Sequence, residues 1–260
     1  MSQASSDDRA RIRQVEAEYF DTHAQAIGEF NPFTDRGWKT LEKCFTRIQL
    51  DARQLNLLDV GCGTGHSRQI YINRCGSYTG IDLSAKELAL ARQKFPNDTW
   101  QEADACEMPF PDDHFDAVCF SSVLHHIPEM QQALQQAYRV LKPGGFIFAY
   151  DPNVFHPAMA MFRHPKSPLY SPMGVSPNEK PLKPSAIRQA LIQSRFTRIV
   201  QWCQSDIPYR EVAPKGFRMF LKVYNGLDWC WQHSGLGHFF GTFIISGAVK
   251  SPDSSFQALP

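Results

Sequence analysis

The stretch NLLDVGCGTGHS, from Asn56 to Ser67, decides the fold, because a short apolar run leads directly into three glycines within five positions. The apolar run predicts a buried strand. Gly61, Gly63 and Gly65 follow it, and glycine both tolerates positive φ and lets other atoms come close to the backbone. Such a turn is typical of a ligand site, but tight packing alone would also require it.

Strand and helix signals alternate along the rest of the chain. Short apolar runs alternating with helical periodicity indicate βαβ units and a parallel sheet covered on both faces. The expected strands are 56–60, 78–81, 99–103, 115–120, 144–150, 198–204 and 240–250. The expected helices are two before residue 50, one ending near Gly76, and others at 84 onward, 128–141, 185–193 and 216–232.

Turn and cap residues mark several of these boundaries. Ser84 and Glu87 form a capping-box pattern at a helix start, Pro128 suits a first helical turn, and the KPGG sequence at 142–145 closes the following helix. The segment 152–184 contains eight prolines. Since proline interrupts both helices and central strands, this segment is expected to be a loop-like insertion over the sheet edge.

Composition favours small-molecule chemistry over nucleic-acid or membrane binding. The 260 residues suit one large domain, and a formal charge of +1 gives no electrostatic case for nucleic acid. Seven cysteines occur without a Cys-x-x-Cys pair, which is typical of a reducing compartment. The polar N-terminus lacks an apolar signal region, and no run of about 18 apolar residues occurs. A soluble, cytoplasmic protein is expected.

Two nucleotide-binding alternatives can be compared with the glycine turn. A phosphate-binding loop needs a longer glycine spacing followed by Lys and Ser or Thr, whereas His66 and Ser67 follow here. That alternative is excluded. A nicotinamide dinucleotide site requires G-x-G-x-x-G, whereas this turn reads G-C-G-T-G, so an NAD-dependent oxidoreductase stays open only as a minor alternative.

Two further acidic residues stand where the next two strands end. Asp82, in YTGIDLS, is placed to accept hydrogen bonds from both hydroxyls of a ribose. Leu83 beside it suits either an adenine face or the core. Asp104, in QEADACEMPF, is either a turn residue or an acceptor for an exocyclic amine, and Ala105 can offer its backbone amide to the same ring.

Four stretches in order resemble the motifs of class I S-adenosylmethionine-dependent methyltransferases, in particular the group that methylates small molecules, quinones, sterols and glycans. They are LLDVGCGTGHS, YTGIDLS, EADACEMPFPDDHFDAVCFSSVLHHI and AYRVLKPGGFIFAYDP. The resemblance implies a Rossmann-like seven-stranded sheet, mostly parallel with an antiparallel last strand, and S-adenosylmethionine as cofactor. The cofactor-binding residues it implies are Asp59, Gly61, Cys62, Gly63, Gly65, Asp82, Leu83, Asp104, Ala105 and Ser121.

Catalytic residues are less well defined by the sequence. Methyl transfer to a hydroxyl, the expected reaction, needs the proton removed, and histidine titrates near neutral pH. His125 and His126 are therefore candidate bases, although a structural or pocket-lining role is favoured for both. Tyr150, Asp151 and His156 follow the fifth strand as weaker candidates. No clustered carboxylates stand out, so no metal site is expected.

The remaining segments are assigned to the acceptor. We expect a single domain with an N-terminal helical lid (1–50), a cofactor-binding core (51–151), the Pro-rich insertion (152–184) and a C-terminal part (185–260). Tyr19 is a candidate lid residue or a core tyrosine. The aromatic face of 216–232, with Phe217, Phe220, Leu221, Tyr224 and Trp231, packs on the sheet or binds a small-molecule, glycan or lipid-linked acceptor. A non-catalytic cofactor-binding module remains the alternative function, and nothing in the sequence supports peripheral membrane contact.

Overall fold

The structure analysed is a computed structural model, which describes residues 6–28, 31–49, 54–157, 166, 176–180, 182–210 and 218–252. Most of the Pro-rich segment 152–184 lies outside the described residues, as does Phe217. Within the described ranges, no helix has the length and apolar character needed to cross a membrane.

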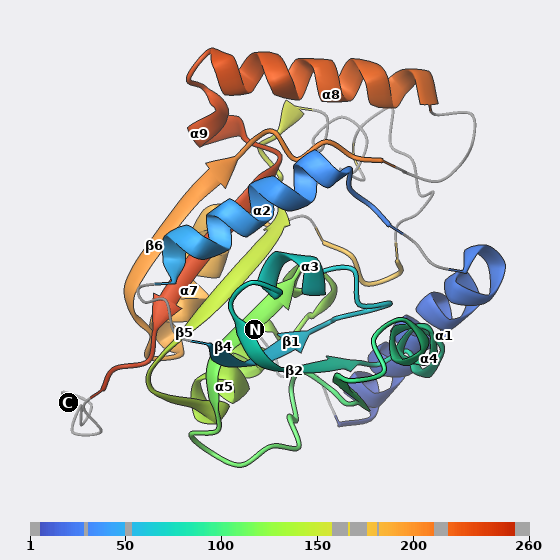
Figure 1. Cartoon of the computed structure of the whole chain (residues 1–260), viewed down its shortest axis with the longest axis vertical. Helices are drawn as coiled ribbons and strands as arrows, with labels where there is room; N and C mark the ends of the chain where they lie inside the picture. Colours follow the sequence, from blue (N-terminus) through green and yellow to red (C-terminus); the bar gives the residue numbers. More distant parts are fainter. Residues whose placement is uncertain are drawn as a thin grey trace.

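Seven strands form one mixed sheet in the order β3-β2-β1-β4-β5-β7-β6 (Figure 1). Strands β1 to β5 pair in parallel, and β7 runs antiparallel to both β5 and β6. The predicted fold class is confirmed. The strands are β1 (Leu55–Val60), β2 (Cys75–Asp82), β3 (Thr99–Glu102), β4 (Phe115–Ser121), β5 (Leu141–Pro152), β6 (Thr197–Gln204) and β7 (Phe243–Val249).

Helices cover both faces of this sheet. In Figure 1, α2 crosses in front of the strands, α8 lies at the top, and α1 lies beside α4. The helices are α1 (Ser6–Ile27), α2 (Asp35–Ile48), α3 (Arg68–Tyr71), α4 (Ala85–Lys94), the 3₁₀ turn η1 (Leu124–His126), α5 (Met130–Val140), α7 (Pro184–Gln193), α8 (Arg218–His233) and α9 (Gly237–Phe240).

Two apolar clusters, one on each face, hold the layers together. One joins α2 to the sheet through Leu41, Phe45 and Leu57. The other joins α5 and α7 to the opposite face through residues such as Leu134 and Leu191. Central strands buried on both faces explain why their sequences read as continuous apolar runs rather than as alternating patterns.

One of the predicted boundaries is wrong and another is close. The helix expected to end near Gly76 ends at Tyr71, because the backbone of Cys75 already pairs with Leu55 and so begins β2. The helix expected to be closed by the KPGG sequence ends at Val140, one residue before the predicted Leu141. The pairing register of β5 with β4 shifts across this sequence, where Gly144 has a positive φ.

The carboxyl ends of β1, β2 and β4 meet where the strand order reverses. Strand β1 has β2 on one side and β4 on the other, which places a crevice at this edge of the sheet. Gly80 in β2 makes the close packing near this edge possible. A Cβ atom at Gly80 would lie 2.7 Å from the Trp100 ring and 2.8 Å from the Cys62 sulfur.

Replacing Gly80 by alanine is therefore expected to lower the free energy of unfolding by about 1–3 kcal/mol, the usual cost of overpacking a core. Gly226 provides a matched control, because it is an exposed helical glycine with nothing within 4 Å of the added Cβ. Gly226→Ala is expected to raise stability by about 0.5–1 kcal/mol. Urea unfolding of both variants tests this, and equal effects would contradict the packing argument.

Candidate functional site

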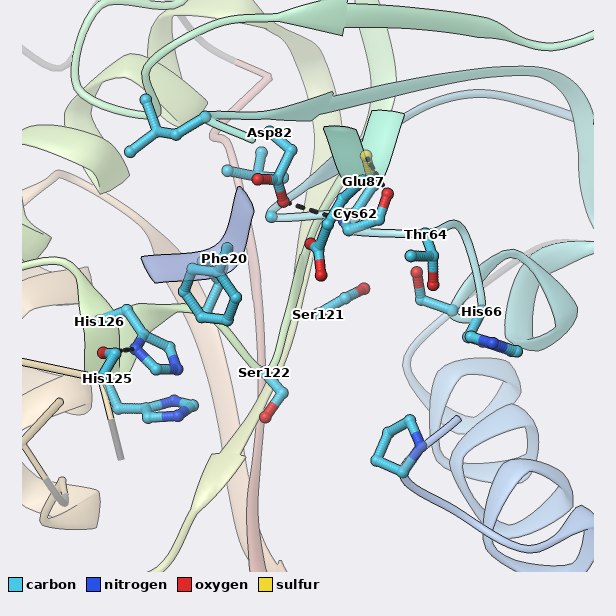
Figure 2. Close-up of a pocket in the computed structure, with 18 of the residues that line it drawn as sticks. Phe20, Cys62, Thr64, His66, Asp82, Glu87, Ser121, Ser122, His125 and His126 are labelled. Atoms are coloured by element: carbon cyan, nitrogen blue, oxygen red, sulfur yellow. Dashed lines mark hydrogen bonds between the residues drawn. The ribbon is translucent and has the colours of Figure 1, made fainter. Parts of the chain in front are cut away.

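A cavity of about 340 Å³ opens at the carboxyl ends of the central strands. Its wall combines the glycine turn after β1, the ends of β2 and β4, and the inner face of α1. Figure 2 shows Asp82, Cys62 and Glu87 gathered in one region, and His125 and His126 in another. Phe20 lies between these two regions in the view, and Ser121 and Ser122 lie below Asp82 and Cys62.

The three glycines of the turn all have positive φ, but their surroundings differ. A Cβ at Gly61 would collide with Val123, and a Cβ at Gly65 would lie 2.7 Å from Trp100. A Cβ at Gly63 would instead meet the end of the Glu87 side chain, at 2.9 Å. Gly61 and Gly63 line the cavity, whereas Gly65 serves the packing beneath it. The glycine cluster therefore serves both expected purposes, since some of its positions leave space for a ligand and others permit tight packing.

Asp59 lies completely buried below the turn and does not contribute to the described cavity wall. Its carboxylate accepts hydrogen bonds from Ser67 Oγ at 2.5 Å, Ser121 Oγ at 2.5 Å and Tyr78 OH at 2.6 Å. Burial raises the pKa of Asp59 to about 6, although these three hydrogen bonds oppose the rise. Asp59 is thus connected to the cavity by its hydrogen bond to Ser121, which lines the cavity.

Asp82 lies at the end of β2 and faces the cavity. Its carboxylate accepts hydrogen bonds from the backbone N–H of Gly63 and of Ser84, both at 2.9 Å. Burial raises its pKa, and the backbone hydrogen bonds oppose that rise. Asp82 therefore holds the glycine turn against the start of α4.

The capping box predicted at Ser84 forms only in half. Ser84 Oγ accepts the Glu87 N–H at 3.1 Å, but the Ser84 N–H donates to Asp82. The Glu87 side chain therefore does not cap the helix and lines the cavity beside Asp82. Its pKa is well above the ordinary value, first because it is buried and then because Asp82 and Asp21 lie near it.

Asp104 and Ala105 line the cavity beyond β3, as does Leu83 beyond β2. Asp104 Oδ1 accepts the Cys106 N–H at 2.8 Å, the local turn expected of a loop aspartate. Asp104 Oδ2 lies 2.6 Å from Nε of Arg13 on α1. The first helix is thereby attached to the β3 side of the site.

His125 and His126 form the opposite region of the cavity, on η1 (Figure 2). His125 Nδ1 lies 2.8 Å from Oδ1 of Asp151, which is completely buried at the end of β5. His126 Nδ1 lies 2.9 Å from Oε1 of Glu16 on α1 and 2.8 Å from Ser176 Oγ. Burial, followed by the neighbouring His125, lowers the pKa of His126 and favours its neutral form.

The remaining catalytic candidates separate into different environments. Tyr150 lines the cavity, whereas Asp151 lies behind His125 and contacts the cavity only through it. His156 lies away from the cavity, with its Nε2 3.8 Å from Asp228 Oδ1 and its ring packed against Tyr224. Burial lowers the pKa of His156. The structure thus brings His125 and Tyr150 to one cavity but leaves His156 outside it.

Several lining residues were not identified from the sequence. Glu87 carried a signal, since it lies three residues after a helix cap at the end of β2, but that position was assigned to capping. Glu179 lies in the Pro-rich segment, which has no periodicity to orient its side chain. Five further aromatic residues from distant segments complete the wall beside the predicted Tyr19: Phe20, Phe33, Trp38, Tyr209 and Phe243.

The expected acceptor segments are only partly described. Tyr19 lies half-buried in the cavity wall, and its role as a lid residue stays a prediction. On α8, Tyr224 is buried against Tyr209, while the side chains of Phe220 and Leu221 lie outside the described residues. The aromatic helix therefore packs on the site's outer wall through Tyr224.

Comparison with known proteins identifies the class. Residues 58–149 match the methyltransferase domain family. Demethylmenaquinone methyltransferase of Chlorobaculum parvum is 34% identical over 122 residues, which is 46% of this chain and 51% of that protein. The chain therefore contains a class I S-adenosylmethionine-dependent methyltransferase domain, and the family resemblance and cofactor predicted from the four motifs are confirmed. The alignment spans only about half the length of that relative.

Solved structures agree on the fold. A Thermotoga maritima S-adenosylmethionine-dependent methyltransferase, described as a possible histamine N-methyltransferase, has a TM-score of 0.62 at 12% identity, covering 92% of this chain and 100% of that chain. Phosphoethanolamine N-methyltransferase 2 of Haemonchus contortus, solved with S-adenosylhomocysteine, has a TM-score of 0.59 at 21% identity, covering 96% and 61%.

The raised pKa of Asp59 makes a testable contribution to stability. Between the unfolded pKa of about 3.9 and the folded pKa of about 6, the folded state binds more protons, so this contribution falls as pH rises and levels off only above about pH 7. Asp59→Asn removes the titration. The free energy of unfolding of the variant minus that of the wild type is therefore expected to increase by about 1 kcal/mol between pH 5 and pH 7.5. Urea unfolding at both pH values measures it, and a pH-independent difference would contradict the assignment.

Proposed function

We propose that this protein transfers a methyl group from S-adenosylmethionine to an oxygen atom of a small aromatic acceptor of the quinol class. The observation that carries this proposal is the two-sided cavity, in which an acidic glycine turn and an aromatic, histidine-containing wall share one space. One side suits the cofactor and the other suits a flat, apolar acceptor.

On the cofactor side, each residue has a proposed role that follows from its position. Asp82 would accept hydrogen bonds from the ribose hydroxyls. The hydrogen bond that it accepts from the Gly63 N–H would set the distance between the glycine turn and the ribose. Asp104 and Ala105 would bind the adenine edge. Gly61 and Gly63 would leave room for the methionyl part, with Ser121 oriented beneath it by Asp59.

On the acceptor side, the wall supports an aromatic ring more than a sugar. Phe20, Phe33 and Trp38 line the cavity together with Tyr209 and Phe243. Aromatic side chains bind flat apolar molecules by area and by edge-to-face contacts, and they offer few of the hydrogen bonds that a glycan needs. The similarity to demethylmenaquinone methyltransferases over half their length is consistent with a quinone-related acceptor.

The proposed mechanism requires alignment and exclusion of water. The cofactor supplies a methyl group on a positively charged sulfur, which is already a good leaving group. The protein's own contribution is to hold the acceptor oxygen in line with that methyl, an effect that provides roughly 7–11 kcal/mol at best. Tyr19 and Phe20 on α1 would limit water entry above the reacting atoms.

Cofactor binding is tested by isothermal calorimetry with S-adenosylhomocysteine. Asp82→Ala is expected to weaken binding roughly 30- to 1,000-fold, corresponding to about 2–4 kcal/mol for the lost charged hydrogen bonds. Asp112→Ala is the matched control, because Asp112 is exposed, pairs with Arg139 and lies outside the cavity wall. If NAD raised the melting temperature and S-adenosylhomocysteine did not, the proposal would be overturned.

Methyl transfer itself is tested with labelled S-adenosylmethionine and a panel of hydroquinones, catechols and sugars. We expect labelled methyl on the oxygen of an aromatic acceptor, located by mass spectrometry, and none on the sugars. Label on a ring carbon would refute the assignment to oxygen. Cofactor binding without transfer to any member of the panel would instead favour a non-catalytic module.

A further inference from the structure

Three potential metal ligands meet on the acceptor side of the cavity. His125, His126 and Glu179 each offer one donor atom, and these atoms all lie within 4.8 Å of one another. All three residues line the cavity. We propose that they bind a divalent transition metal ion of the zinc class, which in turn binds the acceptor's hydroxyl oxygen. This proposal rests on the proposed oxygen acceptor and departs from the expectation of no metal site.

Buried carboxylates already orient both imidazole rings. Asp151 accepts two hydrogen bonds from His125, one from the backbone N–H at 3.1 Å and one at ring Nδ1 at 2.8 Å. Glu16 lies 2.9 Å from Nδ1 of His126. Since both Nδ1 atoms are engaged, Nε2 of each ring is the atom left to bind a metal. A carboxylate on the far nitrogen is the usual outer contact of a metal-bound histidine, and it fixes the ring's orientation.

Glu179 is held near the histidines by backbone contacts on both sides. The Lys180 N–H donates to the His125 carbonyl oxygen at 2.9 Å, and the Glu179 N–H donates to the Ser176 carbonyl oxygen at 3.1 Å. Asn178 Nδ2 donates to Glu16 Oε2 at 2.7 Å. The described segment 176–180 is therefore attached both to η1 and to α1. This attachment keeps the carboxylate close to the two rings.

The donor set selects the class of metal. Two imidazoles and one carboxylate are typical of catalytic zinc sites, in which three protein ligands leave one position open for water or substrate. Magnesium and calcium prefer oxygen ligands throughout and match this set poorly. Co²⁺ accepts the same ligands as Zn²⁺ and, unlike Zn²⁺, absorbs visible light. Cobalt is therefore a suitable probe.

The open position gives the metal a defined part in methyl transfer. The acceptor's hydroxyl oxygen would bind there, which lowers the pKa of its O–H group so that the proton leaves to water. A lone pair on that oxygen then forms the new O–CH₃ bond. The S–CH₃ bond breaks, its electron pair stays on sulfur, and the sulfonium becomes a neutral thioether. No oxidant or reductant is needed.

Titration of chelator-treated, full-length protein with Co²⁺ tests the site without any activity measurement. We expect one equivalent to bind, with a visible absorption band of four- or five-coordinate cobalt that Zn²⁺ abolishes by competition. Glu179→Gln preserves the shape of the side chain but removes its charge, and it should weaken Co²⁺ binding at least about tenfold. His114→Ala is the control, because His114 is exposed and lies outside the cluster. It should bind cobalt like the wild type.

A second variant and a cofactor measurement complete the test. His125→Ala should abolish the absorption band, and circular dichroism together with S-adenosylhomocysteine binding would verify that the variant is folded. Absence of the band in the wild type, or unchanged cobalt binding by both ligand variants, would overturn the metal site. If metal-free protein binds S-adenosylhomocysteine but no cobalt, only the metal site fails. If it binds cobalt but not S-adenosylhomocysteine, the proposed function fails and the metal site remains.

Discussion

The buried carboxylate of Asp59 is the interaction on which the site depends. Burying an unpaired carboxylate here would cost desolvation free energy, and hydrogen bonds from three hydroxyl groups offset that cost. The donors come from different elements: Ser67 follows the glycine turn, Tyr78 lies on β2 and Ser121 ends β4. Ser121 also contacts Tyr71 OH on α3 at 2.8 Å. Asp59 therefore links the end of β1 to the middle of β2, to the end of β4 and to the residue that follows the glycine turn.

The first helix closes the cavity mainly through polar contacts. Arg13 pairs with Asp104 beyond β3, Glu16 contacts His126 on η1, and Asp21 accepts a hydrogen bond from Ser84 Oγ at 2.6 Å. Two of these contacts are on the proposed cofactor side and one is on the proposed acceptor side. Because α1 contacts both sides, its position depends on both.

Prediction from the sequence succeeded for residues whose positions depend on a short stretch of chain, and it failed for residues whose positions depend on contacts with distant segments. The glycine turn, Asp82 and Asp104 are each specified by a strand and the few residues after it, so parallel pairing alone brings them to one edge of the sheet. Glu87 was misassigned because a capping box predicts its backbone contact correctly but not its side chain, and Asp82 occupies the amide that the box would use. Glu179 had no signal, since its place depends on contacts with residues more than 50 positions away.

The sequence by itself determined the alternation of strands and helices, the class of the domain and the sheet edge at which Gly61, Asp82 and Asp104 meet, because these depend on local periodicity and on residues at fixed distances after strand ends. Only the tertiary structure decided which glycines serve the ligand space and which serve packing, and that Asp151 stands behind His125 rather than in the cavity. It also decided that His125, His126 and Glu179 meet. Those relations arise from side chains of different segments that compete for the same buried space and the same hydrogen-bond donors, which no single stretch of sequence encodes.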